Sequence, residues 1–181
     1  PLLDVSSIKL YDSPGVFSLH DDCGAADDLF TWLRENKPDY VLQVISIDHL
    51  KRDLCLTQQL LAANFALLLV LSGDEKSVNL EQFNEEIGAF FGVASVGFNQ
   101  KKAIIDFLQQ QPKVLIERQQ RAVYAQQIPT EQCLEREHQL FQGENELDPG
   151  VLSLIEQRYA LADRLAGKIE VIKKVPQQSF L

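Results

Sequence analysis

Four potential metal ligands stand together near the start of the chain, in the run His20-Asp21-Asp22-Cys23. A zinc site needs a second pair of ligands, and the residues that nominally offer one are His49, Cys55, Cys133 and His138. These lack the Cys-x-x-Cys or His-x3-His spacing typical of structural zinc. We therefore interpret Asp21 and Asp22 as caps of the helix that follows, where carboxylates stabilise the positive end of the helix dipole. We expect neither a metal nor another cofactor.

The same acidic pair follows a short apolar segment, and this arrangement resembles the acidic pair that holds Mg²⁺ in a receiver domain. A receiver also needs a phosphorylatable aspartate after a later strand, for which Asp74 is the candidate, and a lysine after a further strand. No strand-end lysine occurs before Lys101, and a Mg²⁺ site needs several convergent oxygens. A pseudo-receiver that binds a partner without phosphorylation remains one alternative.

Other catalytic signatures are missing from the sequence. It contains no Gly-x-Ser-x-Gly, no phosphate-binding Gly-rich loop and no dinucleotide fingerprint. A cysteine nucleophile needs a base beside the thiol, and no spacing places a histidine there. This favours a binding or regulatory module over an enzyme.

Composition limits the class of protein. The 181 residues carry a formal net charge of −9, which argues against a nucleic acid partner. The longest apolar run, Phe65 to Leu71, is too short to span a membrane. An odd number of cysteines and the absence of a basic leader at Pro1 predict a reduced, cytoplasmic protein.

Apolar periodicity predicts an α/β fold with a mixed sheet flanked by helices over residues 1–125. The predicted helices are 25–36, a helix capped by Asn79, and 101–111. The predicted strands are 16–19, 40–47, 65–71, 93–98, 114–116 and 122–124, with 65–71 central because it is apolar on both faces. The segment 54–63 fits neither period, and we leave it open between helix and strand.

Residues 126–181 form a predicted helical extension. Asp148 caps a long helix that has Pro149 at its first position. Apolar residues at steps of three and four line one seam of this helix: Leu152, Ile155, Tyr159, Ala162, Ala166 and Ile169. The seam packs against the α/β domain, or it forms a dimer interface or a connector to another domain.

The run Leu67 to Asp74, followed by Val78-Asn79-Leu80 and Ile87-Gly88, resembles the strand–turn–helix of YbaK-like aminoacyl-tRNA editing domains. Leu60-Leu61 resembles the preceding strand of that family. Residues 107–117 and the tail 169–181 resemble the segments that link such a domain to an HDOD signalling domain. The resemblance implies a YbaK-like fold, aminoacyl-tRNA deacylase activity and a downstream domain.

The sequence departs from this family at the residues that carry its activity. The family's lysine before the turn is replaced by the run Thr57 to Leu61, and its Gly-rich loop is missing between Phe98 and Val114. Editing requires aligned donors on the ester carbonyl, which these departures remove. We predict a non-catalytic regulatory module of a bacterial signalling protein, with a protein partner, a downstream domain or a second copy bound through the helix seam. A tRNA deacylase is the enzyme alternative.

Overall fold

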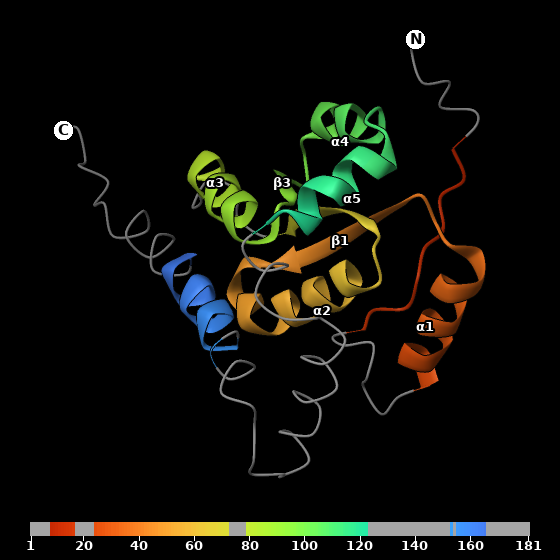
Figure 1. The fold of residues 1–181 in the computed structure, drawn as a ribbon, viewed down its shortest axis with the longest axis horizontal. Helices are drawn as coiled ribbons and strands as arrows, with labels where there is room; N and C mark the ends of the chain where they lie inside the picture. The colour runs from red at the N-terminus through yellow and green to blue at the C-terminus, as the bar shows by residue number, and fades with distance from the viewer. Residues whose placement is uncertain (1–7, 17–23, 73–78, 123–152, 154, 166–181) are drawn as a thin grey trace, which may run out of the picture.

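A computed structural model describes residues 8–16, 24–72, 79–122, 153 and 155–165 of the chain (Figure 1). Its sheet has the strand order β1-β2-β3, formed by β1 (Tyr40–Ser46), β2 (Ala66–Ser72) and β3 (Ala94–Gly97). Both strand pairs are parallel. The mixed sheet that we predicted is therefore wrong for the described strands, because a helix carries the chain back between each strand and the next.

The helices alternate with these strands along the chain. They are α1 (Gly24–Asn36), α2 (Leu50–Ala62) after the short 3-10 helix η2 (Ile47–His49), α3 (Leu80–Phe91), α4 (Lys101–Leu108) and α5 (Pro112–Gln120). Residues 155–165 are also helical. The α/β class and the predicted helices and strands that correspond to α1, β1, β2, α3, β3 and α4 are confirmed. Of the predicted strands 16–19 and 122–124, residues 17–19 and 123–124 lie outside the described residues.

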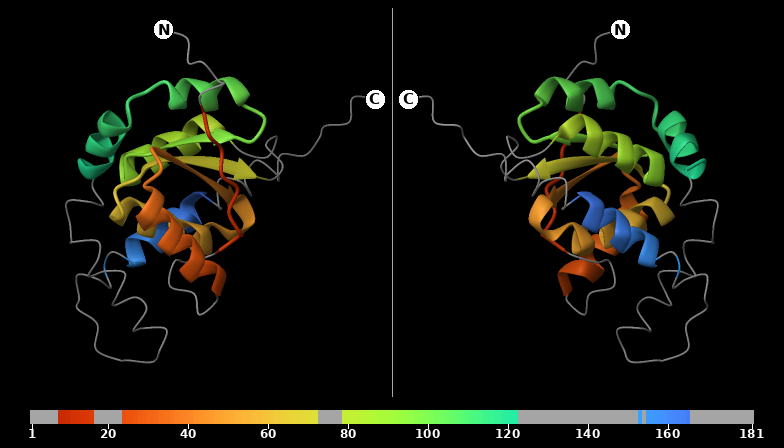
Figure 2. Two further views of the ribbon diagram at one scale, coloured as in Figure 1. Left: turned by 90° about the vertical axis from the view of Figure 1, so that its right-hand side faces the viewer. Right: turned by 90° about the vertical axis from the view of Figure 1, so that its left-hand side faces the viewer.

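Strand β2 is the centre of the fold, and helices cover both of its faces. Leu67, Leu69 and Leu71 point into a core shared with α1, α2, α3 and the helix 155–165. Leu68 and Val70, on the opposite face, pack against α4 and α5. Figure 2 shows α4 and α5 on one side of the sheet and α1, α2 and the helix 155–165 on the other.

The segment that periodicity left open is the helix α2. Leu50, Leu54 and Leu60 are almost fully buried in the main core, so helical spacing places them on one face. The polar side chains Asp53 and Thr57, one helical turn apart, are buried as well. These buried polar positions obscure the apolar period in the sequence. Leu60-Leu61 therefore ends a helix and does not form the strand that the YbaK-like resemblance implied.

The strand predicted at 114–116 is also wrong, because these residues lie in α5. Pro112 occupies the first turn of this helix, where its missing N–H costs nothing. Leu115 is 1% exposed whereas Val114 is 53% exposed. An apolar run of three residues is too short for its period to separate a strand from a helix.

The junction between α3 and α5 requires a glycine. The Asn79 side chain accepts a hydrogen bond from the Gln82 N–H at the start of α3, as predicted. Gly92 ends the helix with a φ of 70°, and a Cβ there would lie 2.9 Å from the Arg118 carbonyl oxygen. Backbone conformation and the close approach of α5 both exclude a side chain at this position.

Gln119 of α5 hydrogen-bonds the start of β2, where the strand has no partner residue on β3. Its Oε1 accepts from the Leu67 N–H (3.0 Å) and its Nε2 donates to the Phe65 carbonyl oxygen (2.7 Å). The side-chain amide thus takes the place of a peptide group on a neighbouring strand. Gln119 itself is only 6% exposed.

We predict that Gln119→Leu lowers the free energy of unfolding by about 1–3 kcal/mol, because it leaves the buried Leu67 N–H of β2 and the partly buried Phe65 carbonyl oxygen just before β2 unpaired. The measurement is urea unfolding of the 181-residue chain. Gln120→Leu is the matched control, since Gln120 bonds only the exposed Asn64 side chain. A change of less than about 0.5 kcal/mol is expected for this control. Equal effects of the two substitutions would contradict the role of Gln119.

Tyr40 ties the start of β1 to the end of α4. Its hydroxyl donates to the Gln110 carbonyl oxygen at 2.7 Å, and its ring contacts Phe107 edge-on at a centroid distance of 5.8 Å. Desolvation by burial, with a smaller contribution from the charge of Asp39, raises the pKa of Tyr40 above its ordinary value. The folded state therefore favours the neutral phenol. The stabilisation that the neutral phenol provides is complete at pH values below the pKa of Tyr40 in the unfolded chain.

We predict that Tyr40→Phe makes the chain less stable at pH 7 by about 0.5–1 kcal/mol, through loss of this hydrogen bond. The difference from wild type shrinks as the pH rises through the raised pKa, because the phenolate has no proton to donate. Chemical unfolding at neutral pH and above about pH 10 measures it. A difference that is constant with pH would show that the hydroxyl does not carry the effect.

Among the described residues, no helix combines the length and apolar character needed to cross a membrane.

Candidate functional site

The parallel sheet brings the carboxyl ends of its three strands to one edge. Ser46 and Ser72 are paired at the ends of β1 and β2, and Leu71 pairs with Gly97 at the end of β3. Phe98 follows directly, level with Ser72. In open parallel α/β sheets, ligands bind outside this carboxyl edge. We therefore take Ser46, Ser72 and Phe98 as the candidate site and call them the carboxyl edge.

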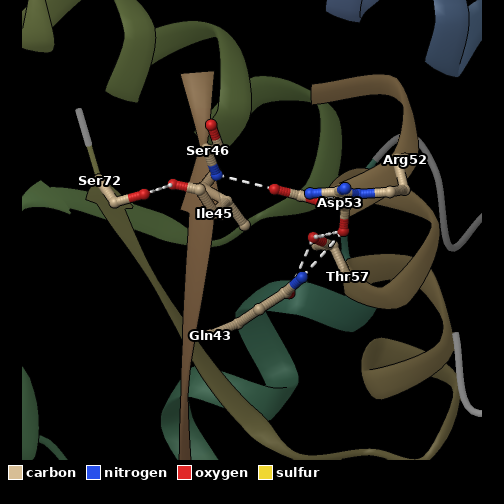
Figure 3. A network of polar contacts seen from close by, with 7 residues as sticks. All are labelled: Gln43, Ile45, Ser46, Arg52, Asp53, Thr57 and Ser72. Atoms are coloured by element: carbon tan, nitrogen blue, oxygen red, sulfur yellow. Dashed lines mark hydrogen bonds and ion pairs between the residues drawn. The ribbon is translucent and has the colours of Figure 1, made fainter. Parts of the chain in front are cut away.

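A network of polar contacts holds the end of β1 in place (Figure 3). The Ser46 N–H donates to Asp53 Oδ2 at 2.7 Å. Arg52 Nε donates to Asp53 Oδ1 at 2.8 Å. From the other side, the Ser72 hydroxyl donates to the Ile45 carbonyl oxygen at 3.1 Å. The last two residues of β1 are thus fixed by α2 and by β2.

The same network fixes α2 against the middle of β1. Gln43 Nε2 donates to the Asp53 carbonyl oxygen (2.8 Å), and the Thr57 hydroxyl donates to Gln43 Oε1 (2.9 Å). Thr57 is fully buried and Gln43 is 6% exposed. Buried polar groups that are hydrogen-bonded to each other hold α2 and β1 in one register, because a shift of either element would leave these groups unpaired.

This arrangement decides what Asp53 can do. Both of its carboxylate oxygens are engaged within the protein, one by the Ser46 backbone and one by Arg52. Asp53 therefore shapes the edge by joining the end of β1 to α2. Within the ranges that the structure describes, no group of three His, Cys, Asp or Glu side chains is placed to hold a metal ion.

The chain at the end of β3 is held by backbone contacts. The Phe98 N–H donates to the Leu71 carbonyl oxygen at 3.1 Å, and the Gln100 N–H donates to the Gly97 carbonyl oxygen at 2.9 Å. Gln100 Oε1 also accepts from the Gly97 N–H at 3.3 Å. Phe98 is nevertheless 61% exposed, so its ring is presented at the edge by a fixed backbone.

Only some of the residues that the sequence suggested as possible ligands lie in the described part of the chain. The run 20–23, Asp74, Cys133 and His138 lie outside the described residues. Cys55 lies on α2, where its Sγ accepts from Gln59 Nε2 at 4.0 Å, and His49 precedes that helix. Neither belongs to a potential metal cluster in the described part of the chain.

Part of the predicted helix seam lies in the described helix 155–165. Ile155 and Ala162 are buried in the chain's own main core, and Tyr159 packs partly buried against it. Arg158, 1% exposed, donates through Nη1 to Gln58 Oε1 on α2. Leu152, Ala166 and Ile169 lie outside the described residues. The dimer interface and the boundary between residues 1–125 and 126–181 stay predictions.

The network around Asp53 was missed by sequence reasoning, although a signal was present. Gln43 interrupts the apolar run of β1, Tyr40–Ser46. Asp53 and Thr57 stand four residues apart and so lie on one face of a helix. A polar residue inside an otherwise apolar strand calls for a buried partner, and this pair on α2 supplies it.

These features describe a parallel α/β domain with a preformed carboxyl edge, and sequence comparison identifies its family. The FeoB_N family (Ferrous iron transport protein B) matches residues 2–109, more than half of the chain. The chain belongs to this family. The matched residues include all three strands, the network around Asp53 and the carboxyl edge. Among curated proteins, no sequence matches significantly.

Two solved structures are similar to the chain. One is the cytosolic domain of FeoB from L. pneumophila, at 19% identity and a TM-score of 0.47, over 88% of this chain and 74% of that one. The other is a mutant NFeoB from S. thermophilus described as bound to GDP, at 14% identity and a TM-score of 0.44. That match covers 90% of this chain and 78% of the other.

The family assignment corrects the earlier expectations about function. The resemblance to YbaK-like editing domains and to an HDOD-linked module is wrong, and so are the regulatory signalling, tRNA deacylase and pseudo-receiver readings. The reason is that a buried strand, a polar turn, a capped helix and a second strand recur in every parallel α/β unit. Residues 67–88 therefore specified the architecture but not the family.

We predict that Thr57→Val lowers the free energy of unfolding by about 1–3 kcal/mol, because Gln43 Oε1 loses its hydroxyl donor in a buried place. Thr57→Ser, which keeps the hydroxyl, is the matched control, with a cost of about 1 kcal/mol for the lost methyl group. Chemical unfolding of the single variants and of the Gln43→Leu/Thr57→Val pair measures the coupling. Strictly additive effects would show that the two side chains do not interact.

Proposed function

We propose that this chain is a cytosolic nucleotide-binding domain of a ferrous iron transport protein, and that nucleotide bound at the carboxyl edge controls the passage of Fe²⁺. The observation that carries the proposal is the family match over residues 2–109. Iron is the cargo of the whole protein in this view, and the domain described here has the controlling role.

The geometry of the carboxyl edge supports a ligand at this place. Ligand sites in parallel α/β domains lie beyond the carboxyl ends of the strands. They are usually preformed and combine apolar surface with a few fixed polar groups. Here the network around Asp53 fixes Ser46, and the Ser72 hydroxyl of β2 lies beside it. Phe98 adds apolar surface at the same edge. The S. thermophilus relative is described as bound to GDP, so GDP is the first nucleotide to test. The sequence contains no phosphate-binding Gly-rich loop, so the proposal relies on the groups of the carboxyl edge alone.

We predict that GDP with Mg²⁺ raises the melting temperature of the 181-residue chain, and that the shift grows with nucleotide concentration. A ligand that binds only the folded state adds about 2.7 kcal/mol of stability at a hundred times its dissociation constant. Differential scanning fluorimetry and titration calorimetry measure the effect, with GTP as the competing nucleotide and ATP as the control. GTP is expected to displace GDP, and ATP is not.

No shift with GDP or GTP would exclude the nucleotide part of the proposal. The iron part has its own measurement, which is uptake of radiolabelled Fe²⁺ by cells that express the intact protein. Asp53→Ala, which releases the Ser46 N–H, is expected to change the uptake, whereas Gln120→Leu is not. Unchanged uptake with a folded Asp53→Ala protein would contradict control through this edge.

A further inference from the structure

The outer sides of α4 and α5 carry basic side chains that no described residue neutralises. Lys101, Lys102 and Lys113 are exposed, and none of them forms an ion pair within the described residues. Residues 101–121 hold five basic and two acidic side chains, a formal charge of +3 in a chain whose net charge is −9. Positive charge is therefore concentrated on these two helices of an otherwise acidic chain.

The positions of these lysines oppose the helices that carry them. Lys101 and Lys102 are the first two residues of α4, and Lys113 is the second residue of α5. The amino end of a helix carries a partial positive charge, which favours acidic side chains and disfavours basic ones. Neither helix has an acidic residue in its first turn. The lysines thus lower the stability of the fold, and contact with an anionic surface outside the protein would offset this loss.

Exposed apolar side chains lie among the lysines. Ile105 of α4 is 45% exposed and Val114 of α5 is 53% exposed. Ile105 lies one helical turn after the two lysines of α4, so helical spacing places all three on one side of the helix. The opposite sides of α4 and α5 pack against the sheet through Phe107 and Leu115, and both helices lie on the same side of the sheet (Figure 2). We call the following residues the basic face: Lys101, Lys102, Ile105, Lys113 and Val114.

We propose that the basic face rests on an anionic lipid surface. Lysines mixed with exposed apolar residues on a helix surface are typical of segments that lie at a membrane interface. Each lysine near such a surface strengthens binding about five-fold, and the aliphatic side chains of Ile105 and Val114 enter the headgroup layer. Charges farther away than about 10 Å are screened at moderate salt, so the acidic remainder of the chain does not cancel this attraction.

The inference rests on the proposed function, in which the chain is a domain of a ferrous iron transport protein. The membrane part of such a protein holds the domain beside the bilayer. A tethered domain has a high effective concentration at the surface, so a contact made by three lysines is sufficient. The contact orients the domain, with α4 and α5 toward the lipid and with α1 and α2, on the other side of the sheet, away from it.

The test is flotation of the 181-residue chain with vesicles of phosphatidylcholine alone and of phosphatidylcholine mixed equally with phosphatidylglycerol. Binding is expected only with the anionic vesicles, and it is expected to disappear at about 1 M salt, where the Debye length is about 3 Å. Lys101→Gln/Lys102→Gln is expected to lower the partition onto anionic vesicles about twenty-fold. Lys37→Glu is the matched control with unchanged partition, because it changes the net charge by the same amount directly after α1.

The melting temperature separates a surface role of the lysines from a role in the fold. The double variant is expected to keep or raise it, because two cations are removed from the amino end of α4, and GDP is expected to shift it as in wild type. A lowered melting temperature together with an unchanged partition would overturn the inference.

The inference and the proposed function fail separately. If wild type does not bind anionic vesicles, or if Lys37→Glu loses binding as much as the double variant, the inference is overturned, and a GDP shift leaves the proposed function standing. If wild type binds anionic vesicles through these lysines but shows no shift with GDP or GTP, the nucleotide part of the proposed function is excluded and the inference stands.

Discussion

The position of β2 between two parallel neighbours is the constraint on which the rest of the structure depends. All but the last of its seven residues are buried, so both faces of the strand need cover and both edges need partners. Parallel pairing then requires a crossover helix before and after the strand. The two crossover helices, α2 and α3, lie on one face with the main core, and α4 and α5 close the other. The carboxyl edge is a consequence of this arrangement, because parallel strands end together.

Side-chain amides complete the sheet where backbone pairing stops. Gln119 pairs with β2 before β3 begins, and the Asn84 side chain accepts from the Ser95 N–H on β3. Gln43 joins β1 to the backbone of α2. Each of these groups satisfies a buried donor or acceptor that would otherwise cost about 1–3 kcal/mol. They also define register, since apolar contacts alone tolerate small shifts.

The wrong family assignment from sequence has a physical origin. Helix capping by Asn79, the apolar stripe of α3 and the buried run of β2 follow from general requirements of a parallel β-α-β unit. They are common to many families with different activities, and function belongs to sites that are added to such folds. In this chain the edge residues Ser46, Ser72 and Phe98 are distant in sequence and have no motif spacing, so the sequence pattern does not group them as a site. They meet only through the pairing of Ser46 with Ser72 and of Leu71 with Gly97.

The sequence by itself determined the elements whose signals are local. The apolar runs of β1 and β2, the cap of α3 and the periodic face of α4 lie within one turn or one strand, where propensity and patterning are sufficient. Only the tertiary structure decided that α2 and α5 are helices and that the strands are parallel. It also decided that Asp53 and Thr57 meet Gln43, and that Phe98 stands exposed at the carboxyl edge. These features depend on contacts between residues far apart in the chain, and the energy of a buried polar pair or a covered sheet face exists only when both partners are in place.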